Sequence, residues 1–533
     1  MKKCIVTGLL TVASLMSHAQ VFQWSVAVDS VVSEETQAHP RAFLWIPEDC
    51  KQVKGIVFTQ HNMIEEGILE NPVFRKTMAT LGFAEVWVTP ALSVVFDFNK
   101  GAGNDFTRLM QSLADTSGYT ELAHAPVIPM GHSALASFPW NFAAWNPGRT
   151  LALVSVHGDA PQTNLTGSGR PNPDWGSRNI DGIPALFVMG EYEWLEPRIT
   201  PAFEYISNHP NSAISLFADA GHGHFDYSEA LIRYLCLFIT KAAKARLPEI
   251  MPIDQPAILK PIQRADGWLM DRWRRDSLPL AKAAPVALYK GMRYQASWVF
   301  DEEMAQATEQ YYAAARGKIN QHIGIIQNGE VIHPQKTHAN YQLSFKPLGD
   351  GISFGIQAFF ADTSRLQAVA EHAGTPLVID RICGPVQKVN DTTFRISFYR
   401  MGFNNPKRSN DIWLLAHNEG DAQYKSIMQQ VDLRFPLENK TGKAQTIDFP
   451  AIPDQSRHAN SYTLNAVSSA GLPVQYYVQE GPAIVKEGKL LFTKIPPRSK
   501  YPVKVVVVAW QYGNAHEPKV QTAQWVERVF YIR

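Results

Sequence analysis

The fold of this chain is decided by residues 125 to 136, which read Ala125-Pro126-Val127-Ile128-Pro129-Met130-Gly131-His132-Ser133-Ala134-Leu135-Ala136. The first half is an apolar strand that runs directly into a Gly-His-Ser-Ala turn and then a helix. A serine on so tight a turn is held out of the fold, and Gly131 avoids the clash that a side chain would make there. The segment predicts a nucleophile, Ser133, at the carboxyl end of a strand; taken alone, Gly-x-Ser is also the pattern of a helix N-cap.

Short apolar or β-branched runs alternate with amphipathic stretches from about Val21 to Pro248. This alternation is typical of an α/β domain with a mostly parallel sheet and helices on both faces. The last amphipathic stretch, Asp226–Arg246, predicts the helix that closes the domain, with Cys236 buried in it. The expected strands are Arg41–Ile46, Gly55–Gln60, Phe83–Thr89, Pro126–Met130, Leu151–His157, Ala185–Met189 and Ala213–Phe217.

Polar clusters follow two of these strands downstream of Ser133. Ala185–Met189 leads into Gly190-Glu191-Tyr192-Glu193, and Ala213–Phe217 leads into a loop that carries His222 and His224. Because the carboxyl ends of parallel strands meet at one edge of a sheet, we expect these groups to gather near Ser133. Nucleophile, acid and histidine also follow one another in the chain order that α/β-hydrolases use.

On these residues the sequence resembles the α/β-hydrolase superfamily of secreted serine esterases, over residues 20–247. One position departs from the usual pattern, because Leu135 stands where the second glycine of the turn normally lies, flanked by small Ala134 and Ala136. The resemblance implies that the Ser133 hydroxyl attacks an ester carbonyl after a histidine has removed its proton, and that a carboxylate orients that histidine.

Several residues compete for the histidine and acid positions. His224 is favoured because Gly223-His224-Phe225 resembles a turn of many secreted esterases, and His222, in a Gly-His-Gly sequence, is a close second. For the acid, Glu193 lies three residues beyond the glycine that ends its strand, where the family normally has an aspartate. Glu191 is the next candidate, and Asp159, after the preceding strand, is a third.

The resemblance also implies an oxyanion hole, in which hydrogen-bond donors stabilise the charge of the tetrahedral intermediate. One donor would be the amide of Ala134, directly after the nucleophile. The other would come from His61 or Asn62, in the loop that follows Gly55–Gln60, through the backbone or a side chain.

Aromatic residues near this edge are candidates for substrate binding. Residues 160–179 are rich in Pro, Gly, Asn and Ser, carry Trp175, and are expected to form a mobile segment over the site. Trp140 follows the nucleophile on its helix. Either indole could stack on a sugar ring or an aromatic acyl group; for Trp140 the alternative is ordinary helix packing.

The remaining chain predicts two further domains. Four prolines between residues 248 and 261 mark a linker. Residues 262–444 are strand-rich and contain one helix, from Asp301 as N-cap to Ala315, in a β-rich middle domain of unassigned role. Residues 445–533 contain short strands separated by turns, which predict a β-sandwich. They resemble the immunoglobulin-like domains appended to secreted bacterial proteins.

Composition and the N-terminus narrow the possible functions. The 50 Lys and Arg against 49 Asp and Glu in 533 residues give a charge of +1, so a nucleic-acid partner is not expected. Lys2 and Lys3 precede an apolar run and Ser17-His18-Ala19, which together predict a signal peptide over residues 1–19 and export to the periplasm or cell exterior. No other apolar stretch approaches the roughly 20 residues of a membrane helix.

The sequence therefore predicts an exported, multidomain serine hydrolase that cleaves a carboxylic ester, with an acyl group on a carbohydrate as the favoured substrate. It contains no His-Glu-x-x-His, no Cys-x-x-Cys and no acidic calcium loop, so no metal or other cofactor is implied. Two alternatives remain at this stage. One is a serine peptidase of the same fold, and the other is a non-catalytic protein that binds a glycan or a partner through a degenerate hydrolase domain.

Overall fold

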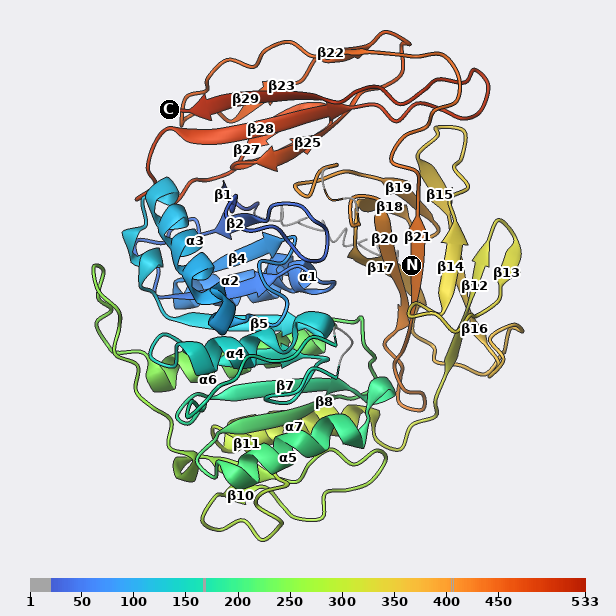
Figure 1. Cartoon of the computed structure of the whole chain (residues 1–533). Helices are drawn as coiled ribbons and strands as arrows, with labels where there is room; N and C mark the ends of the chain where they lie inside the picture. The colour runs from blue at the N-terminus through green and yellow to red at the C-terminus, as the bar shows by residue number, and fades with distance from the viewer. Residues whose placement is uncertain (1–20, 166–168, 404, 406) are drawn as a thin grey trace, which may run out of the picture.

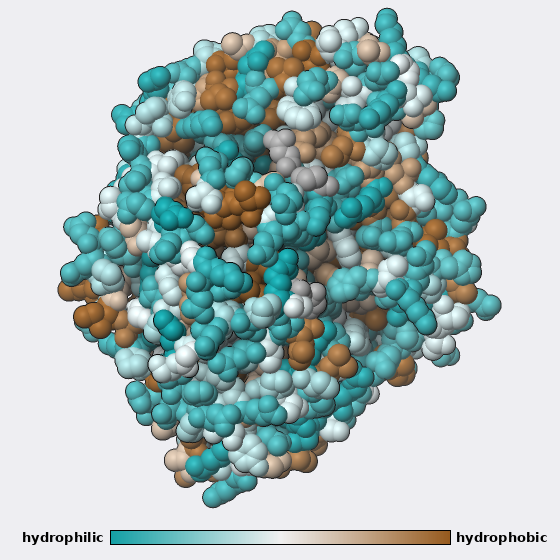
Figure 2. Space-filling view, in the orientation of Figure 1, coloured by the Kyte–Doolittle hydropathy of each residue, from teal (hydrophilic) through white to brown (hydrophobic). Residues whose placement is uncertain are grey.

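The computed structural model describes residues 21–165, 169–403, 405 and 407–533. The predicted signal peptide, residues 1–19, lies outside this range. Within the described residues, no helix is long and apolar enough to cross a membrane. The face of the molecule drawn in Figure 2 is largely hydrophilic and is interrupted by separate hydrophobic patches.

An eight-stranded sheet forms the centre of the N-terminal part, in the order β1-β2-β4-β3-β5-β6-β7-β8 (Figure 1). The strands from β4 to β8 run parallel, and β1 and β2 add an antiparallel edge. The topology is that of an α/β-hydrolase, as the sequence predicts. The strands are Trp24–Ala27 (β1), Arg41–Trp45 (β2), Gly55–Gln60 (β3), Phe83–Thr89 (β4), Val127–His132 (β5), Leu153–Val156 (β6), Ala185–Gly190 (β7) and Ile214–Asp219 (β8).

Helices cover both faces of this sheet. Every residue of the strands β3 to β8 is therefore buried. Side chains of β5 alternate between the two faces: Ile128 packs on the side of α1, α2 and α6, whereas Val127 packs on the side of α3 and α4. The α5 helix covers the end of the second face, over β7 and β8. The helices are Glu65–Glu70 (α1), Pro72–Leu81 (α2), Ala102–Ser117 (α3), Phe138–Trp145 (α4), Glu196–Asn208 (α5) and Glu229–Arg246 (α6).

Most element boundaries expected from the sequence are confirmed within about two residues. The expected ranges of β3 and β4 are those observed, and Cys236 is buried in α6. The helix after Asp301 is also confirmed as α7, Glu302–Ala315, and the Asp301 carboxylate accepts a hydrogen bond from the amide of Met304 at 3.1 Å.

The segment from residue 262 to residue 316 packs on the hydrolase sheet, although it is expected in the β-rich middle domain. Its strands are Trp268–Met270 (β9), Ala284–Pro285 (β10) and Ser297–Val299 (β11). β11 lies against β8, where the Leu216 amide donates to Ser297 Oγ at 2.9 Å. The Tyr312 hydroxyl of α7 accepts a hydrogen bond from the Ala218 amide at 3.1 Å. The α7 helix and this small sheet therefore extend the hydrolase core beyond the proline-rich linker.

Residues 319–437, which we call the middle module, form several small sheets around an apolar core that they share with residues of the C-terminal part such as Tyr477 and Trp510 (right side of Figure 1). The largest sheet has the order β14-β21-β20-β17. Its partners are the sheets β13-β12-β16 and β15-β19-β18. The strands are His322–Gln327 (β12), Glu330–Ile332 (β13), Tyr341–Ser344 (β14), Ser353–Gly355 (β15), Gln357–Ala361 (β16), Val378–Cys383 (β17), Val386–Asn390 (β18), Thr393–Ile396 (β19), Asp411–Asn418 (β20) and Ile427–Arg434 (β21).

The C-terminal module, residues 439–533, consists of short antiparallel sheets at the top of Figure 1. It touches the hydrolase domain, where Arg498 Nη1 lies 2.9 Å from Glu121 Oε1. An immunoglobulin-like relationship stays a prediction. The strands are Ile447–Asp448 (β22), Ser461–Thr463 (β23), Val467–Ser468 (β24), Gln475–Glu480 (β25), Ala483–Lys486 (β26), Lys489–Phe492 (β27), Val503–Trp510 (β28) and Val526–Ile532 (β29).

A buried ion network joins the hydrolase domain to the middle module. Glu66 of α1 is 1% exposed and pairs with Arg381, at 3.0 Å, and with Arg400. Arg400 also pairs with Glu70, and its guanidinium lies over the ring of Phe22 at 4.8 Å. A buried carboxylate needs such partners because it has lost its hydration.

Replacing Arg400 by Met should lower the free energy of unfolding by about 3 to 5 kcal/mol, because Glu66 and Glu70 would lose a cationic partner while Glu66 stays buried. Denaturation in guanidinium chloride measures the change. Lys388→Ala is the matched control: Lys388 pairs with the exposed Asp380 and Asp391, so its removal should cost less than about 1 kcal/mol. Equal losses in the two variants would contradict this account.

Candidate active site

Ser133 lies directly after β5 in a strained backbone conformation. Its φ of 53° is in the left-handed region, which residues with a side chain rarely adopt, and the hydroxyl is thereby turned away from the sheet. A Cβ on Gly131 would lie 2.2 Å from the carbonyl oxygen of Leu135. The turn therefore requires glycine at position 131, as the sequence predicts.

The departure at Leu135 is accommodated by its neighbour. The Leu135 side chain is buried, and the close contact of the turn is made by Ala136, because a Cβ on Gly158 would lie 1.9 Å from that of Ala136. The small residues that allow the chain segments to approach are thus Ala136 and Gly158. The leucine does not distort the turn.

His224 and Glu193 complete a hydrogen-bonded chain with the serine. His224 Nε2 lies 2.7 Å from Ser133 Oγ, and His224 Nδ1 is hydrogen-bonded to Glu193 Oε2. Glu193 ends a short 3-10 helix, Glu191–Glu193, that follows β7, and His224 lies in the loop between β8 and α6. Three groups that follow three different strands therefore meet at the carboxyl edge of the sheet, in the geometry of a nucleophile, a base and an orienting acid.

The structure places the competing candidates elsewhere. His222 pairs with Asp226, and Asp159 accepts a hydrogen bond from the Ser137 hydroxyl at 3.2 Å. Glu191 is bound to Lys425 Nζ at 2.8 Å and to the Gly221 amide at 2.8 Å. Of the sequence candidates, His224 and Glu193 alone are in hydrogen-bonded contact with each other and, through His224, with Ser133.

No family model and no curated protein matches this sequence. Solved structures do show a partial likeness. The fluorophosphonate-binding serine hydrolase F of Staphylococcus aureus is 11% identical, with a TM-score of 0.28 over 41% of this chain and 97% of its own. A ferulic acid esterase is 11% identical, with a TM-score of 0.31 over 42% of this chain and 99% of its own. An esterase from Pyrobaculum calidifontis is 16% identical, with a TM-score of 0.29 over 41% of this chain and 84% of its own.

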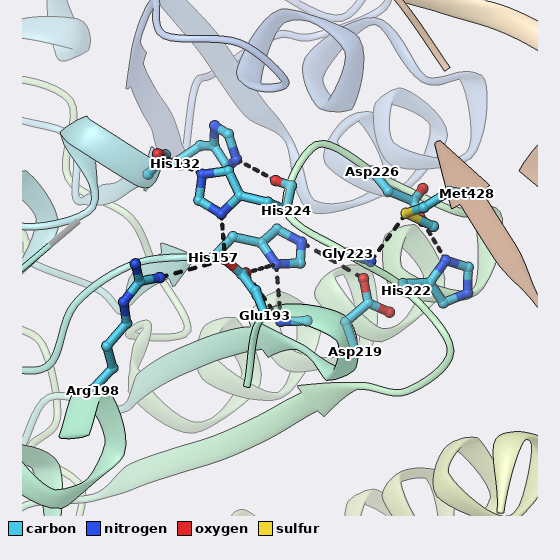
Figure 3. Close-up of polar contacts among 12 residues, drawn as sticks. His132, His157, Glu193, Arg198, Asp219, His222, Gly223, His224, Asp226 and Met428 are labelled. Atoms are coloured by element: carbon cyan, nitrogen blue, oxygen red, sulfur yellow. Dashed lines mark hydrogen bonds and ion pairs between the residues drawn. The ribbon is translucent and has the colours of Figure 1, made fainter. Parts of the chain in front are cut away.

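A second histidine, His157, shares the carboxylate of Glu193 (Figure 3). It is fully buried after β6, its φ is 48°, and its Nδ1 lies 2.8 Å from Glu193 Oε1. Arg198 Nη1 lies 3.5 Å from the other oxygen, Oε2. Burial favours the neutral acid, but hydrogen bonds from His157 and His224 outweigh it and hold the pKa of Glu193 well below its ordinary value. Glu193 is therefore a carboxylate.

The carboxylates of Glu193 and Asp219 face the two ring nitrogens of His157. Burial acts to lower its pKa, but the hydrogen bond and the charge of Glu193, followed by the charges of Asp219 and Asp226, raise the pKa of His157 above its ordinary value. Its Nε2 faces Asp219 Oδ2 at 3.6 Å. Glu193 is thus one member of a buried chain in which carboxyl groups alternate with imidazole rings.

Beyond Asp219 this chain continues into a cluster formed with His222 and Asp226, whose ligand-type atoms all lie within 4.8 Å of one another. Burial opposes the protonation of His222, yet Asp226 and Asp219 raise the pKa of His222 to about 10. An imidazolium therefore already supplies the positive charge that a metal ion would bring to these two carboxylates.

The predicted second oxyanion donor is not a free backbone amide. The amide of His61 donates to the Val88 carbonyl at 2.8 Å, and those of Asn62 and Met63 donate to Glu65 Oε2 at 3.1 and 2.8 Å. The Asn62 side-chain amide instead donates to the carbonyl of His132 at 3.1 Å, one residue before Ser133. Asn62 lies beside the nucleophile turn, whereas the His61 ring is hydrogen-bonded to Thr89 Oγ1.

Glu65 fastens the Asn62 loop to the nucleophile turn. Its Oε1 accepts the amide of His132 at 3.1 Å, while Oε2 accepts the amides of Asn62 and Met63. Burial of this carboxyl raises its pKa to about 7 despite these bonds. His132 Nε2 lies 2.7 Å from the carbonyl oxygen of His224, so Nε2 carries the proton and Nδ1 accepts from Asn62. One buried polar network thus orients both the serine turn and the histidine loop.

The prediction that Trp140 and Trp175 bind substrate is wrong. They are 1% and 2% exposed and belong to the core under α5. The Trp140 indole donates to the Asp159 carbonyl at 2.7 Å, and that of Trp175 donates to Asn141 Oδ1 at 2.7 Å. For Trp140 the alternative of ordinary helix packing is therefore the correct one, whereas the polar sequence around Trp175 does not indicate that its indole lies in the core.

Sequence reasoning missed His157, Glu65 and Arg198. The signal for His157 was present, because it ends a predicted strand one residue before Gly158, in the same kind of position as the triad groups. Glu65 and Arg198 read as ordinary helix residues, since nothing local indicates that Glu65 is fully buried or that Arg198 faces the triad acid.

Glu193→Gln should reduce stability in a pH-dependent way. The lowered pKa of Glu193 stabilises the fold above its ordinary value of 4.5, and this contribution is lost as the pH falls through the folded value. The raised pKa of His157 stabilises the fold below 6.5, and that contribution is lost as the pH rises through its folded value. The difference in unfolding free energy between wild type and Glu193→Gln should therefore be largest between pH 4.5 and 6.5.

Denaturant unfolding at pH 3, 5.5 and 8.5 measures this difference. Glu204→Gln on the exposed side of α5 is the control and should show no such maximum. A difference that stays constant across the three pH values would exclude the charge network as its cause.

Proposed function

We propose that this protein is a serine hydrolase that cleaves a carboxylic ester through an acyl-enzyme on Ser133. The observation that carries the proposal is the continuous chain from Ser133 through His224 to Glu193, built on a serine in the left-handed conformation. A non-catalytic binding protein would have no need to maintain a strained serine in hydrogen-bonded contact with an oriented imidazole.

In this mechanism His224 Nε2 takes the proton of the Ser133 hydroxyl as the oxygen attacks the ester carbonyl. The imidazolium that forms is stabilised by the Glu193 carboxylate on Nδ1, and its Nε2 proton passes to the departing alcohol. Water then attacks the acyl-enzyme with His224 again as base, which releases the acid and restores the serine. The hydrogen bond from His157 and the charge of Arg198, 3.5 Å from Oε2, favour the ionised form of Glu193.

The developing oxyanion needs donors that already point at it. The amide of Ala134 is the first, because it follows the nucleophile directly. The side-chain amide of Asn62 is the second candidate, and it would have to release the His132 carbonyl to serve in this way. The backbone amides of residues 61 to 63 are already committed to other acceptors.

The substrate we propose is an acylated carbohydrate outside the cytoplasm. The predicted signal peptide supports export, and the two β-rich modules give the chain more surface than hydrolysis of a small ester requires. The peptidase alternative has no specific contact in its favour. A direct comparison of an ester with an aminoacyl-arylamide separates the two activities.

Ser133→Ala should abolish covalent labelling by a fluorophosphonate and reduce ester turnover by at least about 10³-fold, while the melting temperature changes little. Peptide mapping of the labelled wild-type protein identifies the modified residue. Ser137→Ala, four residues along the chain, is the control and should still be labelled at Ser133. Turnover that survives the loss of Ser133 would overturn the assignment.

The two histidines should respond differently to replacement by Asn. His224→Asn should lose about 10² to 10⁴ in turnover with little loss of stability, because it removes the general base. His222→Asn should instead lower the free energy of unfolding by about 3 to 5 kcal/mol, because the buried carboxylate of Asp226 would lose the imidazole that pairs with it. Turnover measured beside denaturant unfolding distinguishes them, and the reverse pattern would make His222 the base.

A further inference from the structure

A cavity of about 350 Å³ lies between the triad and the middle module. One side is formed by Glu193, Gly223 and His224 of the hydrolase domain. The opposite side is formed by the middle module, with Asn340, Arg365 and Gln429 among its lining residues. His224 and Glu193, two of the three residues proposed to act on an ester, therefore line one partly open cavity together with polar side chains of the middle module.

The middle module is held close to the catalytic histidine. Two side chains of β21 bind a loop after β13: Gln429 Nε2 donates to the Ala339 carbonyl at 3.1 Å, and Gln430 Nε2 donates to that of His338 at 3.2 Å. The His338 ring centre lies 5.6 Å from that of His224 and 4.9 Å from that of Phe225. The cavity wall is thus fixed relative to the triad.

Arg365 lies in a hydrogen-bonded turn at the edge of this cavity. Its φ is 64°, and the turn is held by Asp362, whose carboxylate accepts the Ser364 hydroxyl at 2.7 Å and the Leu366 amide at 3.2 Å. The Arg365 guanidinium then donates from Nη1 to Gln429 Oε1 at 2.9 Å. A strained turn and a hydrogen bond to the neighbouring strand therefore fix the cation before any ligand arrives.

Arg365 forms no ion pair with the residues that the structure describes, although Asp362 lies in the same turn. Among the described residues, no carboxylate lies within 4.0 Å of its guanidinium nitrogens. The acids of the cavity are already compensated, Glu193 by His157 and Arg198, and Glu191 by Lys425 and Arg275. What the cavity lacks is an anion.

The geometry points to an acidic sugar as the alcohol part of the substrate: we infer that the middle module binds the carboxylate of a uronic-acid residue through Arg365. A guanidinium offers two parallel donors to a carboxylate, which gives both orientation and strength. The amide side chains of Asn340 and Gln429 can bind the sugar hydroxyls. The inference rests on the proposed ester hydrolysis at Ser133 and adds to it the substrate class and the role of the middle module.

The test compares two acetylated disaccharides, one of uronic acid residues and the other with each carboxyl reduced to a hydroxymethyl group. We expect wild-type kcat/KM to favour the acidic disaccharide, and Arg365→Gln to lower that preference roughly 10- to 100-fold, mainly through KM, as expected for a hydrogen bond to a charged group. Arg365→Lys keeps the positive charge but loses the two parallel donors, so its preference for the acidic disaccharide should lie between those of the wild type and Arg365→Gln. Arg457→Gln, an exposed arginine of the C-terminal module, removes the same charge and should keep the wild-type preference.

A third substrate carries the carboxylate on the acyl group of a neutral sugar. It tests whether Arg365 binds the alcohol part or the acyl part of the ester. A preference for it over the acidic sugar would overturn the placement of Arg365 on the alcohol side. A wild-type enzyme that turns over both disaccharides equally, or a preference that survives in Arg365→Gln, would overturn the inference but leave the hydrolase intact. Failure of a fluorophosphonate to label Ser133 in the wild type would instead overturn the proposed function.

Discussion

The carboxylate of Glu193 is the group on which the rest of the site depends. It must stay charged although it is largely enclosed, and a buried charge without partners is very unfavourable. The protein supplies Arg198 on one side and His157 on the other, in addition to His224. His157 in turn faces Asp219, and Asp219 and Asp226 cluster with His222. The carboxylate that orients the His224 imidazole is therefore part of a longer buried chain of carboxyl groups and imidazole rings (Figure 3).

The middle module contacts the loop that carries His224. The histidine loop is held from outside the hydrolase domain: the Gly223 amide donates to Met428 Sδ at 3.0 Å, and Ser426 Oγ donates to the Gly221 carbonyl at 2.9 Å. Lys425 neutralises Glu191 beneath this loop. These three contacts come from residues 425 to 428, where the chain enters β21, the strand whose glutamines also position the cavity wall. The module thus supports the loop that carries the base and lines the space beside it.

Whether a feature of this structure can be predicted from the sequence depends on how far apart in the chain the interacting residues lie. The strands and the turn at Ser133 are local features, and the positions of His224 and Glu193 follow from the rule that strand ends share one edge, so all of these could be inferred. The pairing of Glu193 with His157 joins residues 36 positions apart, and that of Glu191 with Lys425 spans 234. The position of His157 at a strand end could be inferred, but no local pattern shows that Glu193 is its partner or that Lys425 reaches Glu191. The segment 262–316 was assigned to the middle domain for the same reason. Its contact with the hydrolase sheet depends on β8, which is distant in the sequence.

The turn at Leu135 shows that a sequence motif does not fully describe the steric requirements of a structure. In the usual pattern a second glycine follows the serine by two residues, and this sequence has Leu135 at that position. Here the carbonyl of Leu135 lies where a Cβ on Gly131 would be, and the approach of the turn to the loop after β6 is made by Ala136 and Gly158. Neither contact involves the side chain of Leu135, which points into the core. The physical requirement is a left-handed serine with room on both sides, and this chain meets it with Gly131, Ala136 and Gly158. The absence of the second glycine is therefore no argument that the hydrolase domain is degenerate.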